Sequence, residues 1–473
     1  MKKRNEFLAI IFLSAAMVMS GCNGTASTDT GTEVVSSDSA VSENAELGEN
    51  VEVKSDENSA TNLSVVNSSS STLPDASNMF SDRDLEQEAD LSEATYITLE
   101  DGVDVNIDAE GVYVIQGSAT DASIIVDADS AKVQLVLDGI SITNTDSPAI
   151  YVKSADKVFV TTTGDNTLKV TGTFTSDGDA NTDAVIFSKD DLTLNGTGTL
   201  TISSTANGIS GKDDVKFTGG TYNIDSVEDA IEANDSVRIC DGSFTIKSQK
   251  DGIHSEDSDD DTTGFIYISG GNINIDVDAD GIQATTVLMV DSGTIDITAR
   301  ECFEGTYVQI NGGDINLHGE DDGINASNKS SSYQATIEIN GGNLTVEMAS
   351  GDTDAIDSNG NLYINGGIIN ITAQFAFDFD GEAALSGGTV TVNGEEVTEI
   401  EDSMFGKNGF GGGQGSPGGR GFGGDGNTDG KGFGGGNPPE GFDPDNLPEG
   451  FEGGTPPQKP NENTNTNGNN QSK

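Results

Sequence analysis

Apolar and polar residues alternate in short bursts through the middle of the chain. Typical bursts are 273–277, with the sequence Ile-Asn-Ile-Asp-Val, and 295–298, with the sequence Ile-Asp-Ile-Thr. Alternation with a period of two predicts β-strands, and the repeating unit shows no helical period. A pair of residues that ends in glycine, such as Gly312-Gly313, precedes each burst. We therefore predict short strands separated by glycine turns.

The bursts belong to a repeat that is marked by an acidic residue, a small residue and an isoleucine. Successive copies begin 22, 22, 29, 21, 21 and 32 residues apart. The copies are Asn207-Gly208-Ile209, Asp229-Ala230-Ile231, Asp251-Gly252-Ile253, Asp280-Gly281-Ile282, Glu301-Cys302-Phe303, Asp322-Gly323-Ile324 and Asp354-Ala355-Ile356. Such a short unit can bury its apolar face only against the next copy. The repeat predicts an all-β parallel β-helix (β-solenoid) of roughly eleven coils, with the polar insertions 256–261 and 328–332 as loops.

The two ends of the chain differ from this middle in composition. Residues 1–22 combine basic residues, an apolar run and a cysteine after small residues, which predicts a lipoprotein signal peptide and lipobox with Cys22 lipidated. A plain secretory signal is the alternative. Residues 23–94 are too polar for a core and are expected to be a disordered tether. The β-helix domain is expected at 95–403, and a disordered Gly/Pro/Asn-rich tail at 404–473.

The chain carries 80 acidic residues against 22 basic ones, a formal net charge of -58. This charge repels nucleic acid and anionic lipid and attracts cations. We expect an extracellular monomer attached to the cell membrane by lipid alone, because no other apolar stretch reaches the roughly 18 residues that span a bilayer. Cys240 and Cys302 lie three coils apart, about 14 Å at 4.8 Å per coil. A disulfide requires less than about 7 Å between Cα atoms, so none is predicted.

Registering the repeats places polar side chains in two columns. The acidic column contains Asp229, Asp251, Asp280, Glu301, Asp322 and Asp354. The companion column, three residues later, contains Glu232, His254, Gln283, Glu304, Asn325, Asp357 and Asp378. Neighbouring carboxylates about 4.8 Å apart repel by about 0.9 kcal/mol in water, and by about 3.5 kcal/mol at an effective dielectric constant of 20. The acidic column therefore calls for counter-ions.

Calcium is the cation that these oxygen donors suit best. Calcium takes six to eight hard oxygen ligands, whereas zinc and copper favour the sulfur and imidazole donors that are scarce here. We predict Ca²⁺ as the cofactor, with ligands drawn from Glu228, Asp229, Glu232, Asp251, Asp278, Asp280, Glu301, Glu304, Asp321, Asp322, Asp354 and Asp357. An Asp before Gly or Ala can also cap a tight turn through its own side chain. Both explanations can hold, with metal in only some of the coils.

The order of these motifs resembles a known family, the bacterial extracellular carbohydrate-binding domain with a pectate-lyase-like, right-handed parallel β-helix. The similar stretches are 131–140 (AKVQLVLDGI), 149–158 (AIYVKSADKV), 188–192 (SKDDL) and the Asp-Gly-Ile coils. The resemblance covers residues 95 to 395. It implies a calcium-binding protein that attaches to plant cell-wall polysaccharide, either cellulose or acidic pectic glycan, without cleaving it. It also implies metal binding at Asp229, Asp251, Asp280 and Asp322, while the coil that begins at Glu301 departs from the pattern.

Composition narrows the choice of glycan. The chain has no Trp, so stacking on sugars falls to a few Phe and to Tyr222, Tyr267, Tyr307, Tyr333 and Tyr363. Acidic polysaccharide held through Ca²⁺ therefore suits the chain better than cellulose.

Two alternatives to a non-enzymatic binding protein remain. One is a calcium-dependent polysaccharide lyase with Lys212, Lys247 or Lys250 as the base, although no catalytic residue is assigned. The other is a structural surface adhesin that acts through the Phe- and Gly-rich tail.

Overall fold

The computed structural model describes residues 72–178, 180–351 and 353–401. The predicted signal peptide with Cys22, most of the predicted tether and the whole predicted tail lie outside these residues. Within the described ranges the chain is all-β, as predicted, with 32 strands and one short 3-10 helix, η1 (Ala76–Asn78). No helix in this part of the chain is long and apolar enough to cross a bilayer.

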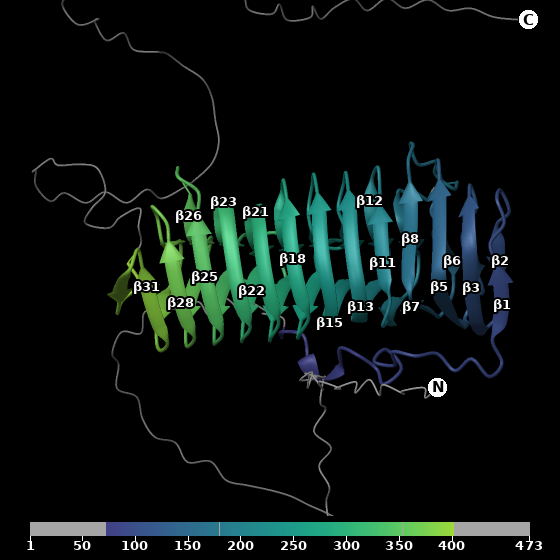
Figure 1. Cartoon of the computed structure of the whole chain (residues 1–473). Helices are drawn as coiled ribbons and strands as arrows, with labels where there is room; N and C mark the ends of the chain where they lie inside the picture. The colour runs from purple at the N-terminus through teal and green to yellow at the C-terminus, as the bar shows by residue number, and fades with distance from the viewer. Residues whose placement is uncertain (1–71, 179, 352, 402–473) are drawn as a thin grey trace, which may run out of the picture. The chain divides into compact units, whose positions relative to one another are not determined.

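The strands lie side by side, each paired with its equivalent in the neighbouring repeats (Figure 1). They form three rows, which are named first, second and third below. The first row contains β1 (Thr95–Thr98), the start of β3 (Gly111–Thr120), the start of β5 (Lys132–Asn144), β7 (Lys157–Thr163), β10 (Leu192–Gly196), the start of β13 (Asp214–Ser226), the start of β15 (Ser236–Ser248), β17 (Phe265–Ile268), β20 (Val287–Val290), β22 (Tyr307–Ile310), β24 (Thr336–Ile339), β27 (Asn361–Ile364) and β30 (Ala383–Leu385).

The second row contains the later parts of β3, β5, β13 and β15 with β8 (Asp165–Val170), β11 (Thr199–Ser203), β18 (Asn272–Val277), the start of β21 (Thr294–Gly305), the start of β23 (Asp314–Ala326), β25 (Asn343–Met348), β28 (Ile368–Thr372) and β31 (Thr389–Val392). The third row contains β2 (Val105–Ile107), β4 (Ile124–Asp127), β6 (Ile150–Ser154), β9 (Ala184–Ser188), β12 (Asn207–Gly211), β14 (Ile231–Ala233), β16 (Ile253–Ser255), β19 (Asp280–Ala284), the ends of β21 and β23, β26 (Asp354–Ser358) and β29 (Asp378–Phe379).

Pairing between these strands is parallel in all three rows of the described chain. The exception among named strands is the hairpin of β31 with β32 (Glu395–Val397), which is antiparallel. Partners are one repeat apart, as where β14 pairs with β16 and β16 with β19. The repeat period therefore predicted the parallel stacking correctly.

The isoleucine of the repeat forms a buried ladder inside this stack. Ile253 pairs with Ile282 of the next repeat, and both are fully buried. The residue before each isoleucine is small because the space is filled: a Cβ on Gly252 would lie 2.6 Å from the carbonyl oxygen of Gly281 and 2.8 Å from Cγ2 of Ile275. Close packing of this kind fixes the register, and with it the height of the acidic residue in each coil.

The end of the predicted tether is a correction to the sequence analysis. Residues 72–87, named the strap below, were expected to be disordered but pack against the first row. Met79 is 5% exposed and belongs to an apolar cluster with Tyr267 and Met289. The polar composition of this segment gave no sign of the packing. A few apolar side chains are enough to hold the strap, because the first row already provides a folded surface for them to contact.

Polar contacts hold the other half of the strap. The Asp84 carboxylate is 1% exposed and lies 2.6 Å from the Lys157 ammonium. The side-chain nitrogen of Gln87 donates to the carbonyl oxygen of Thr218 at 2.9 Å. These partners are far away in sequence, so local composition could not predict them.

Candidate functional site

The two predicted columns are present on the third row. In the acidic column, Asp280 pairs with Glu301, Glu301 with Asp322, and Asp322 with Asp354. The companion column runs in continuous register through Glu232, His254, Gln283, Glu304, Asn325, Asp357 and Asp378. The carboxylates of successive coils are therefore neighbours, as the repeat predicted.

The predicted ligands fall into three groups by exposure. The buried group, 2–7% exposed, contains Asp229, Asp251, Asp280, Glu301 and Glu304. The half-buried group contains Glu232, Asp322, Asp354 and Asp357, and the exposed group contains Glu228, Asp278 and Asp321. Among the described residues, only members of the buried group join others in sets of three donor atoms that lie within 4.8 Å of one another.

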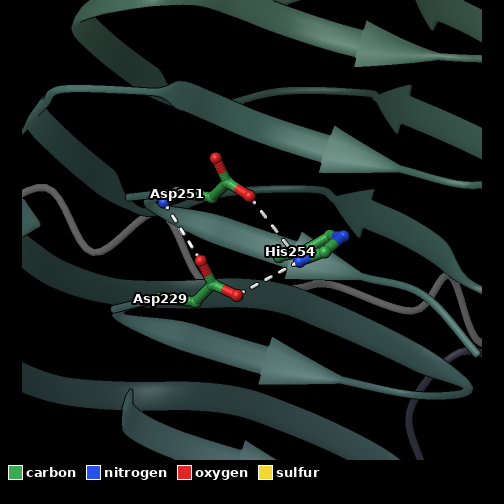
Figure 2. Close-up of side chains that lie close together, drawn as sticks. All are labelled: Asp229, Asp251 and His254. Carbon is green, nitrogen blue, oxygen red and sulfur yellow. Dashed lines mark hydrogen bonds and ion pairs between the residues drawn. The ribbon is translucent and has the colours of Figure 1, made fainter. Parts of the chain in front are cut away.

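The first set, named the histidine cluster, contains Asp229, Asp251 and His254 (Figure 2). The three side chains point toward one another just before and within β14 and β16. His254 Nδ1 lies 3.3 Å from Asp229 Oδ2 and 3.7 Å from Asp251 Oδ2. Its other nitrogen, Nε2, lies 3.1 Å from Glu256.

Both aspartates of this cluster also accept a hydrogen bond from the backbone of the next coil. Asp229 Oδ1 accepts from the Asp251 amide at 3.1 Å, and Asp251 Oδ1 accepts from the Asp280 amide at 2.9 Å. The turn-capping alternative thus has a structural counterpart, but the cap acts on the following coil rather than on the residue's own turn. One oxygen of each carboxylate ties neighbouring coils together, which leaves the other oxygen for a cation.

The histidine cluster already contains its cations. Burial disfavours the His254 charge, but hydrogen bonds to Asp229 and Glu256 outweigh it and raise the pKa of His254 to about 10. Burial likewise opposes the Asp229 charge, yet hydrogen bonds from His254 and from Lys250, at 3.0 Å, leave the pKa of Asp229 lowered. A protonated imidazole offers no lone pair to a metal. The two buried carboxylates therefore face two basic side chains, and the exposed Glu256 adds a third acid.

The second set, named the carboxylate cluster, contains Asp280, Glu301 and Glu304. These residues lie on β19 and the end of β21, two paired strands that carry members of both columns. Arg300 contacts Asp280 at 2.9 Å, but its side chain is 43% exposed and is shared with Glu301 and Asp321. Lys329, from the predicted insertion, lies 3.0 Å from Glu304. Three buried carboxylates thus face two partly exposed basic side chains.

The carboxylate cluster is only partly neutralised by these basic side chains. Burial, followed by the charges of Glu301 and Asp251, raises the pKa of Asp280 to about 7 even though Arg300 is in contact. The amide of Asn325 donates to Glu301 at 2.9 Å, while its oxygen is buried with no hydrogen-bond partner in this part of the chain. Buried carboxylate and amide oxygens form a donor set that fits a hard cation such as Ca²⁺.

Repulsion continues along the columns toward the C-terminus. Burial, followed by the charges of Asp357 and Glu301, raises the pKa of Asp322 to about 8. Burial and the charges of Asp378 and Asp354 raise the pKa of Asp357 to about 6. The carboxylates that follow the carboxylate cluster thus add to its need for a cation.

A cavity of about 280 Å³ opens beside the histidine cluster. It is lined by Glu228, Asp229, Glu232, Lys212, Lys250 and His254, among others. Lys212 lies 3.3 Å from Glu232, and hydrogen bonding to Asp229 raises the pKa of Lys250 although burial opposes this. Lys250 is therefore an ammonium at neutral pH, which suits attraction of an anion and not proton abstraction.

The tyrosines predicted to stack on sugars do not share one surface. Tyr222 is a correction: it is fully buried and stacks on Phe244, with ring centroids 5.0 Å apart. Tyr267 is 5% exposed beneath the strap. Tyr307, Tyr333 and Tyr363 remain partly exposed on or near the first row. These five tyrosines, all among the described residues, therefore form no aromatic platform beside the acidic column.

Sequence reasoning missed Arg300 and Lys329, two of the basic residues that neutralise the column. Arg300 directly precedes Glu301, a member of the acidic column, and this position could have identified it. Lys329 lies in an insertion outside the repeat register, so no sequence signal placed it near Glu304.

Comparison with known proteins gives one family, one similar protein and one similar solved structure. The family model for carbohydrate-binding domain-containing proteins matches residues 101–305 and 303–406, more than half of the chain. A carbohydrate-binding domain-containing protein of Acetivibrio thermocellus is 38% identical over 123 residues, which cover 25% of this chain and 43% of that relative. The chain thus spans less than half the length of the curated relative that it matches.

One solved structure is also similar. It is the gadolinium derivative of a polysaccharide lyase-like protein from C. thermocellum, 30% identical, with 47% of this chain and 92% of that chain covered and a TM-score of 0.38.

Proposed function

Because this chain belongs to the family of carbohydrate-binding domain-containing proteins, we propose that it binds an acidic polysaccharide of the pectic class through the third row. The observation that carries the proposal is the carboxylate cluster, whose three buried acids lack full neutralisation. A cation shared with the carboxylates of a polyuronate would supply what the cluster lacks. Binding without cleavage is the activity we assign.

Calcium is the proposed cation, and Asp280, Glu301 and Glu304 are the residues that would hold it, with Asn325 beside them. When bound, calcium supplies positive charge that the protein shares with the ligand's carboxylates. The protein's own residues orient this site: the Asp251 carboxylate fixes the Asp280 amide at 2.9 Å. His254 and Lys250 neutralise the neighbouring coils, so the histidine cluster needs no metal.

Acidic glycan is favoured over cellulose by the surface chemistry. The chain lacks Trp, and Tyr222 and Tyr267 are buried, which removes much of the stacking area that a neutral crystalline glycan would use. Cellulose remains the alternative ligand in the test below.

The proposal extends to the shape and the location of the protein. We infer a right-handed parallel β-helix of roughly eleven coils, supported by the parallel rows and by the strong preference of crossover connections for the right hand. We place it outside the cell as a lipoprotein anchored through Cys22, as a monomer that contacts the membrane by lipid alone. The export signal in residues 1–22 supports this placement.

A calcium-dependent lyase is the alternative activity. Its base would be a neutral lysine, but Lys212 and Lys250 pair with carboxylates, and Lys247 lies 3.6 Å from Asp276 on an exposed surface. Each of the three lysines thus has a carboxylate partner, so we assign binding rather than catalysis.

Retention on insoluble pectate and on cellulose tests the proposal. We expect retention on pectate with calcium, its loss on adding a chelator, and no unsaturated product detectable by ultraviolet absorbance. Glu301→Gln should abolish retention, whereas Asp225→Asn, at an exposed acid of the second row, should not. Equal retention with and without chelator would overturn the calcium bridge, and release of unsaturated product would establish the lyase.

A further inference from the structure

The strap covers a basic strip on the first row of this acidic protein. The strip consists of Lys132, Lys157, Lys216 and Arg238, on β5, β7, β13 and β15. Lys157 and Lys216 are only 8% and 7% exposed. Arg238 is also in contact with the strap, because it donates to the Met79 carbonyl at 3.3 Å. The strap therefore covers part of a strip whose basic side chains also pair with Asp156, Asp191 and Asp214.

One acidic side chain of the strap, Asp84, contacts two residues of the first row. Asp84 Oδ1 lies 2.6 Å from Lys157 Nζ and accepts a hydrogen bond from Thr193 Oγ1 at 2.8 Å. Asp84 is 1% exposed and Thr193 is fully buried. An ammonium and a hydroxyl directed at one buried oxygen form a binding arrangement for a carboxylate.

The aromatic ring of Phe159 lies next to these contacts. The Arg83 guanidinium stacks over Phe159, with 4.5 Å between the carbon and the ring centroid, and Lys157 Nζ lies 5.4 Å from the same centroid. Planar or ring-shaped groups pack well on such a face. A cavity of about 280 Å³ remains between strap and strip, lined in part by Lys132, Lys157, Lys216 and Phe159.

We propose that this seam cavity is a second carbohydrate site, in which the carboxylate of a uronic-acid glycan replaces Asp84 on Lys157 and Thr193 while a sugar ring packs on Phe159. The strap is then a built-in competitor for the site. The contacts with the glycan come from Lys157, Thr193 and Phe159, while Asp156 and Asp191 also line the cavity. The site therefore needs no calcium and does not depend on the carboxylate cluster. An acidic peptide offers carboxylates but no sugar ring for Phe159, so the glycan is the ligand assigned.

The test is binding of a soluble oligogalacturonate to the full chain by calorimetry, with a chelator present throughout. Asp84→Ala should bind at least about tenfold more tightly than wild type, because a tethered competitor acts at high effective concentration. Adding Lys157→Met to Asp84→Ala should remove the gain, and salt should weaken it. The chelator keeps this result separate from the calcium-dependent retention proposed above, so either site can fail alone.

Release of the strap is checked by trypsin cleavage after Arg83, with circular dichroism to confirm that each variant folds. A combined Met79→Ala, Asp84→Ala, Gln87→Ala variant removes both the apolar and polar anchors. Rapid cleavage without a gain in binding would overturn the site, as would a gain that survives Lys157→Met. Resistance of the combined variant to trypsin would show that the strap is a permanent part of the fold. Equal binding of poly-aspartate would overturn the assignment to a glycan.

Discussion

The histidine cluster and the carboxylate cluster lie on the same third row, yet their buried carboxylates are neutralised to different extents. In the first, Asp229 and Asp251 face His254 and Lys250 within the protein. In the second, Asp280, Glu301 and Glu304 face only the partly exposed Arg300 and Lys329. The repeat produces the same stacking of acids in both places. What differs is the residue that each coil contributes to the companion column.

We propose that this difference separates a structural role from a binding role. A group whose charges are already balanced strengthens the stack and attracts no cation. A group with excess carboxylates is less stable alone and gains most from a bound cation. The predictions below test this division.

The largest effect is expected from breaking the histidine cluster. His254→Ala leaves Asp229 buried without its main partner, so we expect a loss of about 3–5 kcal/mol in the free energy of unfolding. Denaturant unfolding without calcium measures this loss. Lys250→Ala is the matched control: its side chain is 50% exposed, so the loss should stay below about 1 kcal/mol. An unchanged free energy of unfolding in His254→Ala would contradict the structural role.

The carboxylate cluster should reverse the usual dependence of an aspartate on pH. The pKa of Asp280 is about 7 in the folded protein against 3.8 for its ordinary value, so the folded state holds the proton more tightly. Its stabilisation is present below about pH 4 and is lost as the pH rises through 7. Without calcium, we expect the free energy of unfolding to fall by about 2–4 kcal/mol from pH 5 to pH 8.

Asp280→Asn should flatten this loss when unfolding is measured by denaturant at each pH. His254, whose folded pKa is about 10 against 6.5, adds a loss of the same sign above about pH 6.5. A slope that persists unchanged in Asp280→Asn would therefore assign the effect to other groups with raised pKa values, such as Asp322 and His254. Saturating calcium should abolish the part that Asp280→Asn removes.

How far the sequence could predict these features depends on whether they follow the repeat. The columns, the isoleucine ladder and the parallel pairing repeat with a fixed register, so they were predictable. The burial of Tyr222 was predictable as well, because it shares the inward side of its strand with Ile224 and pairs with Phe244. The prediction that Tyr222 stacks on sugar overlooked this alternation.

Features outside the repeat could not be predicted from local patterns. The strap contacts partners such as Thr218, 131 residues away from Gln87. Lys329 reaches Glu304 from an insertion that has no register. The backbone hydrogen bond that Asp229 accepts comes from the next coil, so a local turn motif gives no sign of it. Each is a long-range contact that exists only after the coils stack.

The smallest effect distinguishes the two sets of basic residues. Lys329→Met removes a cation that competes with calcium at Glu304, so calcium affinity should increase about two- to tenfold, within the range of partly exposed ion pairs. Lys250→Met, beside the histidine cluster, should leave affinity unchanged. Calorimetric titration of both variants measures the difference. Weaker calcium binding in Lys329→Met would mean that the lysine supports the site rather than competes with it.

The central claim is that the carboxylate cluster, and not the histidine cluster, binds calcium. Calcium titration by calorimetry of the wild type, Glu304→Gln and Asp229→Asn tests it most directly, because both substitutions keep side-chain shape while each removes one buried charge. We predict that wild type and Asp229→Asn bind calcium with similar affinity and that Glu304→Gln binds at least about tenfold more weakly, a difference of about 1.4 kcal/mol. Unchanged binding in Glu304→Gln together with loss in Asp229→Asn would contradict the claim.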